Sequence, residues 1–341
     1  METTSTSTVL GMISLGPQWQ TLDPFLFCAH HVDDYPQGDG TMAPDASLSG
    51  REIGSDFSGT DGWSMYHGSS VPGFPQHPHR GFETITFARR GVIDHSDSLG
   101  ATARFSSGDV QWMTAGSGIV HSEMFPLVNT DADNPLELFQ VWLNLPAVDK
   151  LVDPYFTMLW SENIPRLELP DGGQVTIIAG RLGDVDPPTP PPNSWAARDE
   201  SDLAIWHITL PAGSKWTVPV NDPASSRVLY QFAGAGLTIG DQRLPARTGA
   251  QVRSGIEIEI AATDEAVEVL LLQGAPIGEP VAKYGPFVMN TREEIEQAFA
   301  DYQETQFGGW PWPTDGPVHP ATDDRFAVHA NGEREDAPST S

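Results

Sequence analysis

Lysine is the scarcest charged residue in this chain, and basic residues as a whole are few. Only Lys150, Lys215 and Lys283 occur, and 18 Lys and Arg stand against 46 Asp and Glu, which gives a formal net charge of −28. Affinity for a nucleic-acid backbone comes from clustered basic side chains, and the sequence has no basic run. The composition therefore argues against direct binding of DNA or RNA.

Cysteine is nearly absent, and long apolar runs are missing. The single cysteine, Cys28, has no partner for an internal disulfide, and its apolar neighbours in PFLFCAH predict a buried core thiol rather than a nucleophile. No segment approaches the run of about 20 apolar residues that spans a membrane. The N-terminal METTSTSTVLGMISLG lacks a positively charged start and a long apolar block, which argues against a secretory signal. We expect a soluble, cytoplasmic protein.

The acidic residues are spread along the chain and do not form one tail. A surface of this kind is strongly hydrated, and concentrated salt screens its self-repulsion. The distribution leads to the hypothesis that the protein is halophilic.

Short segments of alternating polarity, broken by Gly, Pro and Asp, predict an all-β fold of strands and tight turns. Two sets of such segments show the same alternation of polarity broken by turn residues. TFARRG (residues 86–91) also resembles QFAGAG (231–236), which indicates two copies of one β domain. The expected boundaries are a flexible arm over 1–16, one domain over 17–150, a second over 151–290, a helix over 291–304, and a Gly/Pro/Trp-rich stretch and acidic tail over 305–341.

The stretch NTREEIEQAFADYQ predicts the short C-terminal helix. Thr291 and Glu294 have the spacing of a capping box. An apolar stripe at helical spacing follows, made of Ile295, Ala298, Phe299 and Tyr302. Beyond it, ANGEREDAPSTS is typical of a disordered acidic tail.

Two pairs of potential metal ligands stand out. His77 and His79 are two residues apart, so in a strand they share one face, about 7 Å apart along the chain. His121 and Glu123 repeat the spacing some forty residues later. Three imidazoles and a carboxylate on two neighbouring strands suit a divalent transition metal.

A structural explanation competes with this one. A lone histidine is more often a surface or satisfied core residue than a ligand, and a single HxH pair is weak evidence. The added HxE pair favours the metal site, and Gly108, Gly116 and Gly118 supply turns and close approaches between the strands.

The strings HPHRGFETITF, SLG, GDVQWMTAGSGIVHSE and EPVAKYGPFVMNTREEIEQAFADYQ resemble the pirin family, a branch of the bicupin superfamily, over roughly residues 18–304. The resemblance implies two tandem cupin β-sandwich domains, with one metal in the N-terminal domain. Fe(II) is the usual metal, and another divalent transition metal is the alternative. The implied ligands are His77, His79, His121 and Glu123.

The resemblance also bears on residues that are not expected to bind the metal. Many cupins ligate through a Glu placed like Glu83, but pirin-like proteins use the HxE carboxylate, so Glu83 is expected to support the site without ligating. Arg80 beside it is either a charge partner or part of a surface ion pair. In the second domain Asn221, Asp222 and Ala224 fall where histidines would stand, which implies a metal-free domain.

Several further residues lie near the site in sequence without ligand spacing. His31 and His67 are candidates for lining a cavity, whereas His207 in LAIWHITL suits a core or partly exposed strand position. Pocket-wall candidates, for which a plain core role is the commoner alternative, are Gln111, Trp112, Met113 and Phe125. His30 and His95 have no assigned role.

The resemblance also implies two candidate functions. Some pirin-like proteins are quercetin 2,3-dioxygenases, oxidoreductases that cleave a flavonol-like enol with O₂. In that case Glu123 is both a ligand and the candidate catalytic base. The alternative is a redox-sensitive metal-binding regulator that acts on a protein partner, either a transcription factor or a metabolic enzyme. The strong acidity of this chain argues against the role in DNA complexes that eukaryotic pirin-like proteins have.

Overall fold

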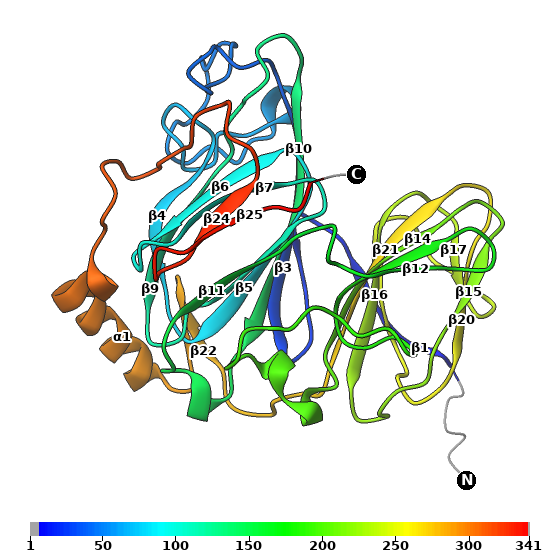
Figure 1. The fold of residues 1–341 in the computed structure, drawn as a ribbon. Coiled ribbons are helices and arrows are strands. Elements are labelled where there is room, and N and C mark those ends of the chain that lie inside the picture. Colours follow the sequence, from blue (N-terminus) through cyan, green and yellow to red (C-terminus); the bar gives the residue numbers. More distant parts are fainter. Residues whose placement is uncertain (1–6, 340–341) are drawn as a thin grey trace. The chain divides into compact units, whose positions relative to one another are not determined.

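The computed structural model describes residues 7–339, and the chain forms two compact units (Figure 1). The smaller unit joins Met1–Cys28 to Asn163–Gly278, and the larger unit joins Ala29–Glu162 to Glu279–Ser341. The expected all-β architecture with one C-terminal helix is confirmed. The domain boundaries expected near residues 16, 150 and 290 stay a prediction. No helix among the described residues is long and apolar enough to cross a membrane.

The smaller unit is built from two antiparallel sheets with the strand orders β1-β19-β16-β21-β14-β13-β12 and β15-β20-β17-β18. Its strands and 3₁₀ turns are β1 Val9–Ser14, β2 Gln18–Trp19, β12 Arg166–Glu168, β13 Gln174–Ala179, η3 Trp195–Ala197, η4 Asp199–Ser201, β14 Ala204–Leu210, β15 Lys215–Val218, β16 Ser226–Ala233, β17 Leu237–Ile239, β18 Gln242–Arg243, β19 Thr248–Val252, β20 Ile258–Ala262 and β21 Val267–Gly274.

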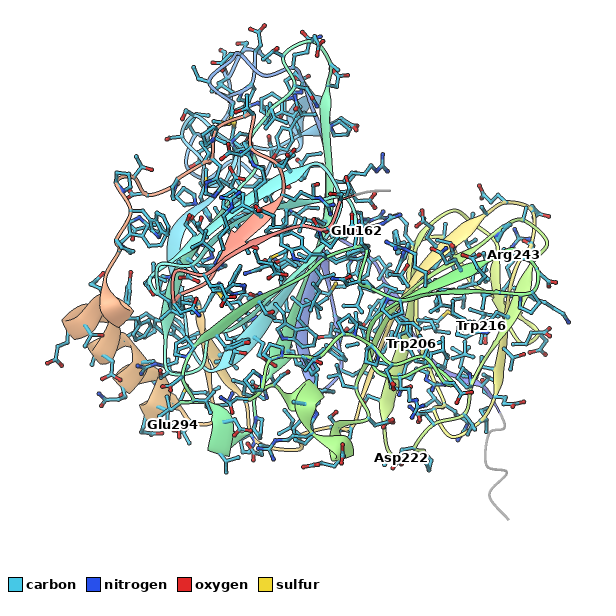
Figure 2. The ribbon with its side chains drawn as sticks, in the orientation of Figure 1. Glu162, Trp206, Trp216, Asp222, Arg243 and Glu294 are labelled. Carbon is cyan, nitrogen blue, oxygen red and sulfur yellow. The ribbon has the colours of Figure 1, made fainter. Side chains whose placement is uncertain are left out.

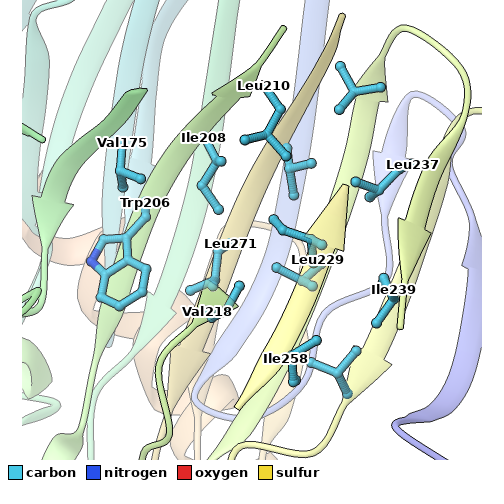
Figure 3. Close-up of a cluster of buried hydrophobic side chains, with 14 of the residues drawn as sticks. Val175, Trp206, Ile208, Leu210, Val218, Leu229, Leu237, Ile239, Ile258 and Leu271 are labelled. Atoms are coloured by element: carbon cyan, nitrogen blue, oxygen red, sulfur yellow. The ribbon is translucent and has the colours of Figure 1, made fainter. Parts of the chain in front are cut away.

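Alternating side chains of these strands form one apolar core (Figure 3). On β14, Trp206, Ile208 and Leu210 point into it, because every second residue of a strand faces the same side. Trp216 of β15 packs at its margin, with its ring centroid 6.3 Å from that of Trp206 (Figure 2). Cys28 is fully buried, which confirms the expected core thiol.

The N-terminal segment differs from the expected flexible arm. Residues 9–14 form β1, which pairs antiparallel with β19 and places Met12 opposite Ala250. The Thr/Ser-rich start masks a short alternating pattern in VLGMIS, and the edge of a sheet offers such a strand its backbone hydrogen bonds. Residues 1–6 lie outside the described part of the chain.

The larger unit holds two six-stranded sheets with the orders β11-β8-β5-β10-β3-β2 and β25-β24-β7-β6-β9-β4, together with the ribbon β22-β23. The strand β2 and the first residues of β3 are counted with the smaller unit. The remaining elements are β3 Phe25–Tyr35, η1 Thr60–Gly62, β4 Gly73–His79, β5 Phe82–Arg90, β6 Val92–Asp97, β7 Thr102–Ser106, β8 Val110–Thr114, β9 Ile119–Met124, β10 Asn134–Asn144, η2 Ala147–Asp149, β11 Tyr155–Leu159, β22 Ala282–Tyr284, β23 Phe287–Met289, α1 Arg292–Thr305, η5 Gln306–Gly308, β24 Phe326–Val328 and β25 Arg334–Asp336.

The helix α1 begins where its sequence predicts. The Thr291 hydroxyl accepts a hydrogen bond from the Glu294 backbone N–H, and the Glu294 carboxylate accepts one from the Thr291 backbone N–H. Figure 2 labels Glu294 at this end of the helix. Ile295 and Ala298 pack onto Phe287 of β23, so the helix covers the β22-β23 ribbon.

A disordered acidic tail was expected over residues 330–341, but β25 lies within that stretch. The strand β24 pairs with β7, placing Phe326 opposite Arg104, and β25 pairs with β24 in turn (Figure 1). Phe326 and Ala327 are buried, so two apolar residues anchor a segment that is otherwise polar. The acidic composition concealed strands of only three residues each.

Candidate metal centre

Two neighbouring strands carry the predicted ligands. In the antiparallel pair β4 and β9, His77 lies directly opposite His121, and His79 follows two residues later on the same face as His77. A β-bulge between Phe74 and His77 shifts the register just before this point. The pairing therefore brings together the two motifs that sequence spacing had linked.

Glycine shapes the turn that leads into β9. Gly116 and Gly118 both have positive φ, a conformation that side chains with a Cβ rarely adopt. A Cβ on Gly118 would lie 2.5 Å from the ring of Phe307, so the close approach also requires glycine. The expected turn role of these residues is confirmed.

The three histidines form one compact group. Their candidate ligand atoms all lie within 4.8 Å of one another. The ring centroid of His121 lies 4.4 Å from that of His77 and 4.9 Å from that of His79. His79 and His121 are buried, whereas His77 is half-buried and forms the open side of the group.

Hydrogen bonds fix two of the three imidazoles. The Nδ1 of His77 lies 2.9 Å from the carbonyl oxygen of Pro75, and the Nδ1 of His79 lies 3.3 Å from that of Pro286. A carbonyl only accepts, so each Nδ1 carries the proton and each Nε2 keeps a free lone pair. That arrangement presents both Nε2 atoms to a metal ion.

His121 supplies the test of whether a metal fits. Both of its ring nitrogens are buried and lack a hydrogen-bond partner within the described residues. A buried polar atom without a partner costs about 1–3 kcal/mol, and a coordinated ion removes that cost. The orphaned imidazole therefore fits a metal ligand better than a packed core residue.

Electrostatics keep this group neutral. Burial lowers the pKa of His77 to about 4, and it holds the pKa values of His79 and His121 well below the usual range for histidine. Neighbouring imidazoles add to the lowering at His121. At neutral pH the three rings are unprotonated, which is the form that binds metal.

Glu123 lies on the same strand as His121, but its carboxylate makes other contacts. Its Oε1 accepts a hydrogen bond from the Thr86 hydroxyl at 2.8 Å, and its Oε2 accepts one from the Gln140 amide at 2.6 Å. Burial raises its pKa. Among residues 7–339 the cluster of ligand atoms within 4.8 Å consists of the three histidines, without Glu123. Its role as fourth ligand stays a prediction.

His95, which sequence spacing left without a role, also belongs to these surroundings. It lies directly opposite Glu123 in the pairing of β6 with β9, and its ring centroid is 5.5 Å from that of His121. The fully buried ring contacts Asp97 at 3.2 Å and Gln111 at 3.3 Å. The alternation of VIDHSD indicated a strand, but its register against β9 is set by the tertiary fold.

Glu83 and Arg80 make structural contacts. The Glu83 carboxylate is buried and accepts hydrogen bonds from Thr114 at 2.7 Å and from the Trp112 indole at 3.2 Å. Arg80 pairs with Asp301 of α1 at 2.6 Å and also donates to a backbone carbonyl. Both residues hold the scaffold around the histidines.

A cavity of about 970 Å³ opens beside His77. Its lining residues are Thr41, His67, Ser69, Ser70, Val71, Pro75, Gln76, His77, Met124, Pro313, Thr314, Asp315, Gly316, Pro317 and Val318. His67 was an expected lining residue. Gln111, Trp112, Met113 and Phe125 are absent from the described lining and are buried, as plain core residues are.

The remaining histidines have other partners. His31 contacts the Tyr66 hydroxyl at 2.9 Å, and His30 contacts Glu137 at 3.0 Å. His207, in the smaller unit, pairs with Glu268 at 2.7 Å.

Comparison with known proteins identifies the family. The family model Pirin matches residues 6–143, and the model Pirin C-terminal cupin domain matches residues 205–308. A Pseudomonas aeruginosa protein named "Putative quercetin 2,3-dioxygenase PA2418" is 39% identical over 237 residues, which cover 69% of this chain and 79% of that protein. Pirin-1 of Arabidopsis thaliana is 37% identical over 69% of this chain and 78% of its own length.

Solved structures agree with this result. The crystal structure of quercetin 2,3-dioxygenase from Acinetobacter baumannii is 27% identical to this chain, with a TM-score of 0.70, and the match covers 89% of this chain and 98% of that one. Its fold and the two family models together assign two cupin domains to this protein. The chain belongs to the pirin family.

Proposed function

We propose that the protein is a cytoplasmic, mononuclear non-haem metal dioxygenase that acts on a flavonol-like enol with O₂. One observation carries the proposal. The ligand atoms of three neutral imidazoles lie within 4.8 Å of one another, His77 among them lines a cavity, and the buried His121 has no protein partner for either nitrogen within residues 7–339. A purely structural cluster would satisfy these atoms with hydrogen bonds. The quercetin 2,3-dioxygenase names of the relatives support the choice of substrate class.

The proposed ligands are His77, His79, His121 and Glu123, and Fe(II) is the proposed metal. A metal held by these residues would supply Lewis-acid and redox chemistry to the enol and O₂. The backbone carbonyls of Pro75 and Pro286 orient two of the imidazoles. This support presets the ligand geometry before substrate enters.

The buried carboxylate of Glu123 is the proposed base. Burial raises its pKa, which brings it closer to that of an acidic enol hydroxyl. The proton passes from the substrate hydroxyl oxygen to a carboxylate oxygen of Glu123. Thr86 and Gln140 hold that carboxylate in one orientation through their hydrogen bonds.

The test is anaerobic loading with Fe(II), followed by O₂ uptake and carbon monoxide release with quercetin in high KCl. We expect turnover by the wild type, and in His121→Ala a loss of more than about 100-fold in metal affinity together with turnover. His329→Ala is the matched control, because its ring lies outside the three-histidine group and bonds to Glu335. Bound iron without turnover would reject the dioxygenase and favour a redox-linked regulatory protein.

We also propose that the acidic surface is an adaptation to concentrated salt. The formal net charge of −28 supports this proposal.

A further inference from the structure

The chain beyond residue 308, where the second family model ends, reaches the candidate metal centre. We call residues 310–320 the strap. The indole of Trp312 donates a hydrogen bond to the Asp97 carbonyl at 2.8 Å, next to the end of β6. The segment then continues into β24, which pairs with β7. The strap is therefore held at both ends on the larger unit.

A buried ion pair fastens the far end of the strap. Arg104 forms two hydrogen bonds of 2.8 Å with the carboxylate of Asp94, and both side chains are buried. The same guanidinium donates to the carbonyls of His319 and Pro320, at 2.9 Å and 2.6 Å. Asp94 also accepts the backbone N–H of His319 at 2.8 Å. Bidentate, charge-assisted bonds of this kind hold a segment in one geometry.

The middle of the strap is bonded to the residue next to a proposed ligand. The backbone N–H of Gln76 donates to the Asp315 carbonyl at 2.7 Å, and the Gln76 amide donates to the Asp315 carboxylate at 2.7 Å. His77 follows directly in β4. The strap thus passes within one residue of the open side of the histidine group.

Six consecutive strap residues, 313–318, form one wall of the cavity beside His77. Proline and valine make much of this wall apolar, and Met124 adds to it from β9. Hydroxyl groups come from Thr41, Ser69, Ser70 and Thr314. Asp315 is the one carboxylate, and neither Arg nor Lys occurs in the described lining.

We propose that the strap is the specificity-determining wall of the substrate cavity, which admits a planar polyphenol without charged substituents. The inference rests on the proposed function and names the residues that select its substrate. Apolar surface with a few hydroxyl groups suits a flat, hydroxylated ring system. Asp315 disfavours substrates that carry a sulfonate or carboxylate, because a like charge placed opposite it is repelled.

The first experiment narrows the cavity. Thr314→Trp adds an indole to the wall at an exposed position, and Thr322→Trp makes the same change at an exposed position outside the lining. Both variants are loaded with Ni(II), and the binding of quercetin is followed without O₂ by visible absorption. We expect the dissociation constant to rise about tenfold or more in Thr314→Trp, which corresponds to the loss of about 1.4 kcal/mol, and to stay unchanged in Thr322→Trp.

The second experiment tests charge selection. Asp315→Asn keeps a side-chain oxygen that can accept the hydrogen bond from the Gln76 amide. Asp324→Asn makes the same change at an exposed position and is the matched control. We expect Asp315→Asn to bind a sulfonated quercetin about threefold more tightly at low salt, since removal of an exposed like charge has a modest effect that salt screens. The ratio of affinities for sulfonated and unmodified quercetin should therefore rise in Asp315→Asn, and it should stay the same in Asp324→Asn.

A third measurement tests the role of the strap independently of the proposed flavonol substrate. The rate at which 2,6-dipicolinate, a planar aromatic chelator, removes Ni(II) reports access to the metal independently of quercetin. One outcome is that quercetin fails to bind to wild type while dipicolinate removes Ni(II) more slowly from Thr314→Trp than from Thr322→Trp. That result would reject the flavonol substrate and support the strap as the wall of the cavity. Equal removal rates in these two variants would overturn the assignment of the strap as the wall. Equal quercetin binding in the two variants would overturn it too, where the wild type binds quercetin. Equal affinity of Asp315→Asn and wild type for the sulfonated ligand would overturn the charge selection.

Discussion

Buried polar side chains in the larger unit fall into two groups, according to whether the protein satisfies them. Glu137 accepts hydrogen bonds from Arg89 at 2.6 Å and Arg90 at 3.1 Å, and it contacts His30 at 3.0 Å. His121 is equally buried, yet both of its nitrogens lack a partner among residues 7–339. Complete satisfaction indicates a structural role, whereas an orphaned imidazole beside two others belongs to a group that could hold a metal ion. The contrast distinguishes scaffold from site at the level of single residues.

The scaffold role of Glu137 has a measurable pH dependence. Burial acts to raise the pKa of Glu137, but the hydrogen bond with His30 and the charges of Arg89 and Arg90 outweigh it and lower the pKa from 4.5 to about 2. Because the folded pKa lies below the unfolded one, this carboxylate stabilises the fold above pH 4.5, and the contribution is lost as the pH falls toward 2. A shift of this size corresponds to about 3 kcal/mol. Urea unfolding measured over this pH range should show the loss.

Two variants test this assignment. Glu137→Gln should lower the free energy of unfolding at pH 7, and its difference from wild type should shrink toward pH 2, because Gln does not titrate. Glu304→Gln, at an exposed position on α1, should match wild type throughout. A constant difference between Glu137→Gln and wild type across the range would contradict the assignment.

At the scale of elements, α1 is the part of the fold that local sequence determines most directly. Its start depends on Thr291 and Glu294, which satisfy each other's backbone N–H groups. The helix packs on β23 only through its buried side, so its first turn relies on the cap. The position of the helix could therefore be predicted to within a residue.

Removal of the cap should loosen the first turn. Thr291→Ala deletes the acceptor for the Glu294 N–H, and we expect it to cost about 1 kcal/mol. Amide hydrogen exchange at Glu294 should accelerate accordingly. Thr291→Ser keeps a hydroxyl acceptor and should stay close to wild type. Equal exchange rates in Thr291→Ala and Thr291→Ser would show that packing alone fixes this helix.

The pairing of the strands could not be predicted from the sequence pattern. Alternation placed His77 beside His79 and His121 beside Glu123, because a strand repeats every two residues. The register that sets His77 opposite His121 comes from pairing across more than forty residues, with a bulge before His77. Local pattern carries no record of that pairing. The HxE spacing likewise could not show that Glu123 is engaged by Thr86 and Gln140.

The strap and its strands were missed for a related reason. Strands β24 and β25 have three residues each, and β7, with which β24 pairs, lies some 220 residues earlier in the chain. Segments this short have no readable period, and the acidic composition around them is typical of disorder. Only the tertiary structure shows that this part of the chain lines the cavity beside His77.

At the scale of the whole molecule, charge is the most unusual property. The formal net charge of −28 is spread over the chain, and arginines pair with many of the buried carboxylates, as Arg104 does with Asp94. The unpaired excess is therefore carried by exposed acids. Self-repulsion among them opposes the compact state, and salt weakens it.

Stability should therefore rise with KCl. The screening length falls from about 10 Å at 0.1 M to about 3 Å at 1 M salt, so repulsion between neighbouring exposed carboxylates weakens over this range. We expect the midpoint of thermal unfolding at pH 7.5 to increase steadily with KCl. At about pH 5, where carboxylates begin to take up protons, the increase should be smaller, since fewer like charges remain to be screened. The comparison between the two pH values separates charge screening from a general effect of KCl on apolar surface, which would act at both. A midpoint that KCl leaves unchanged at pH 7.5 would refute the proposed salt adaptation, and an equal increase at both pH values would assign the effect to apolar surface instead.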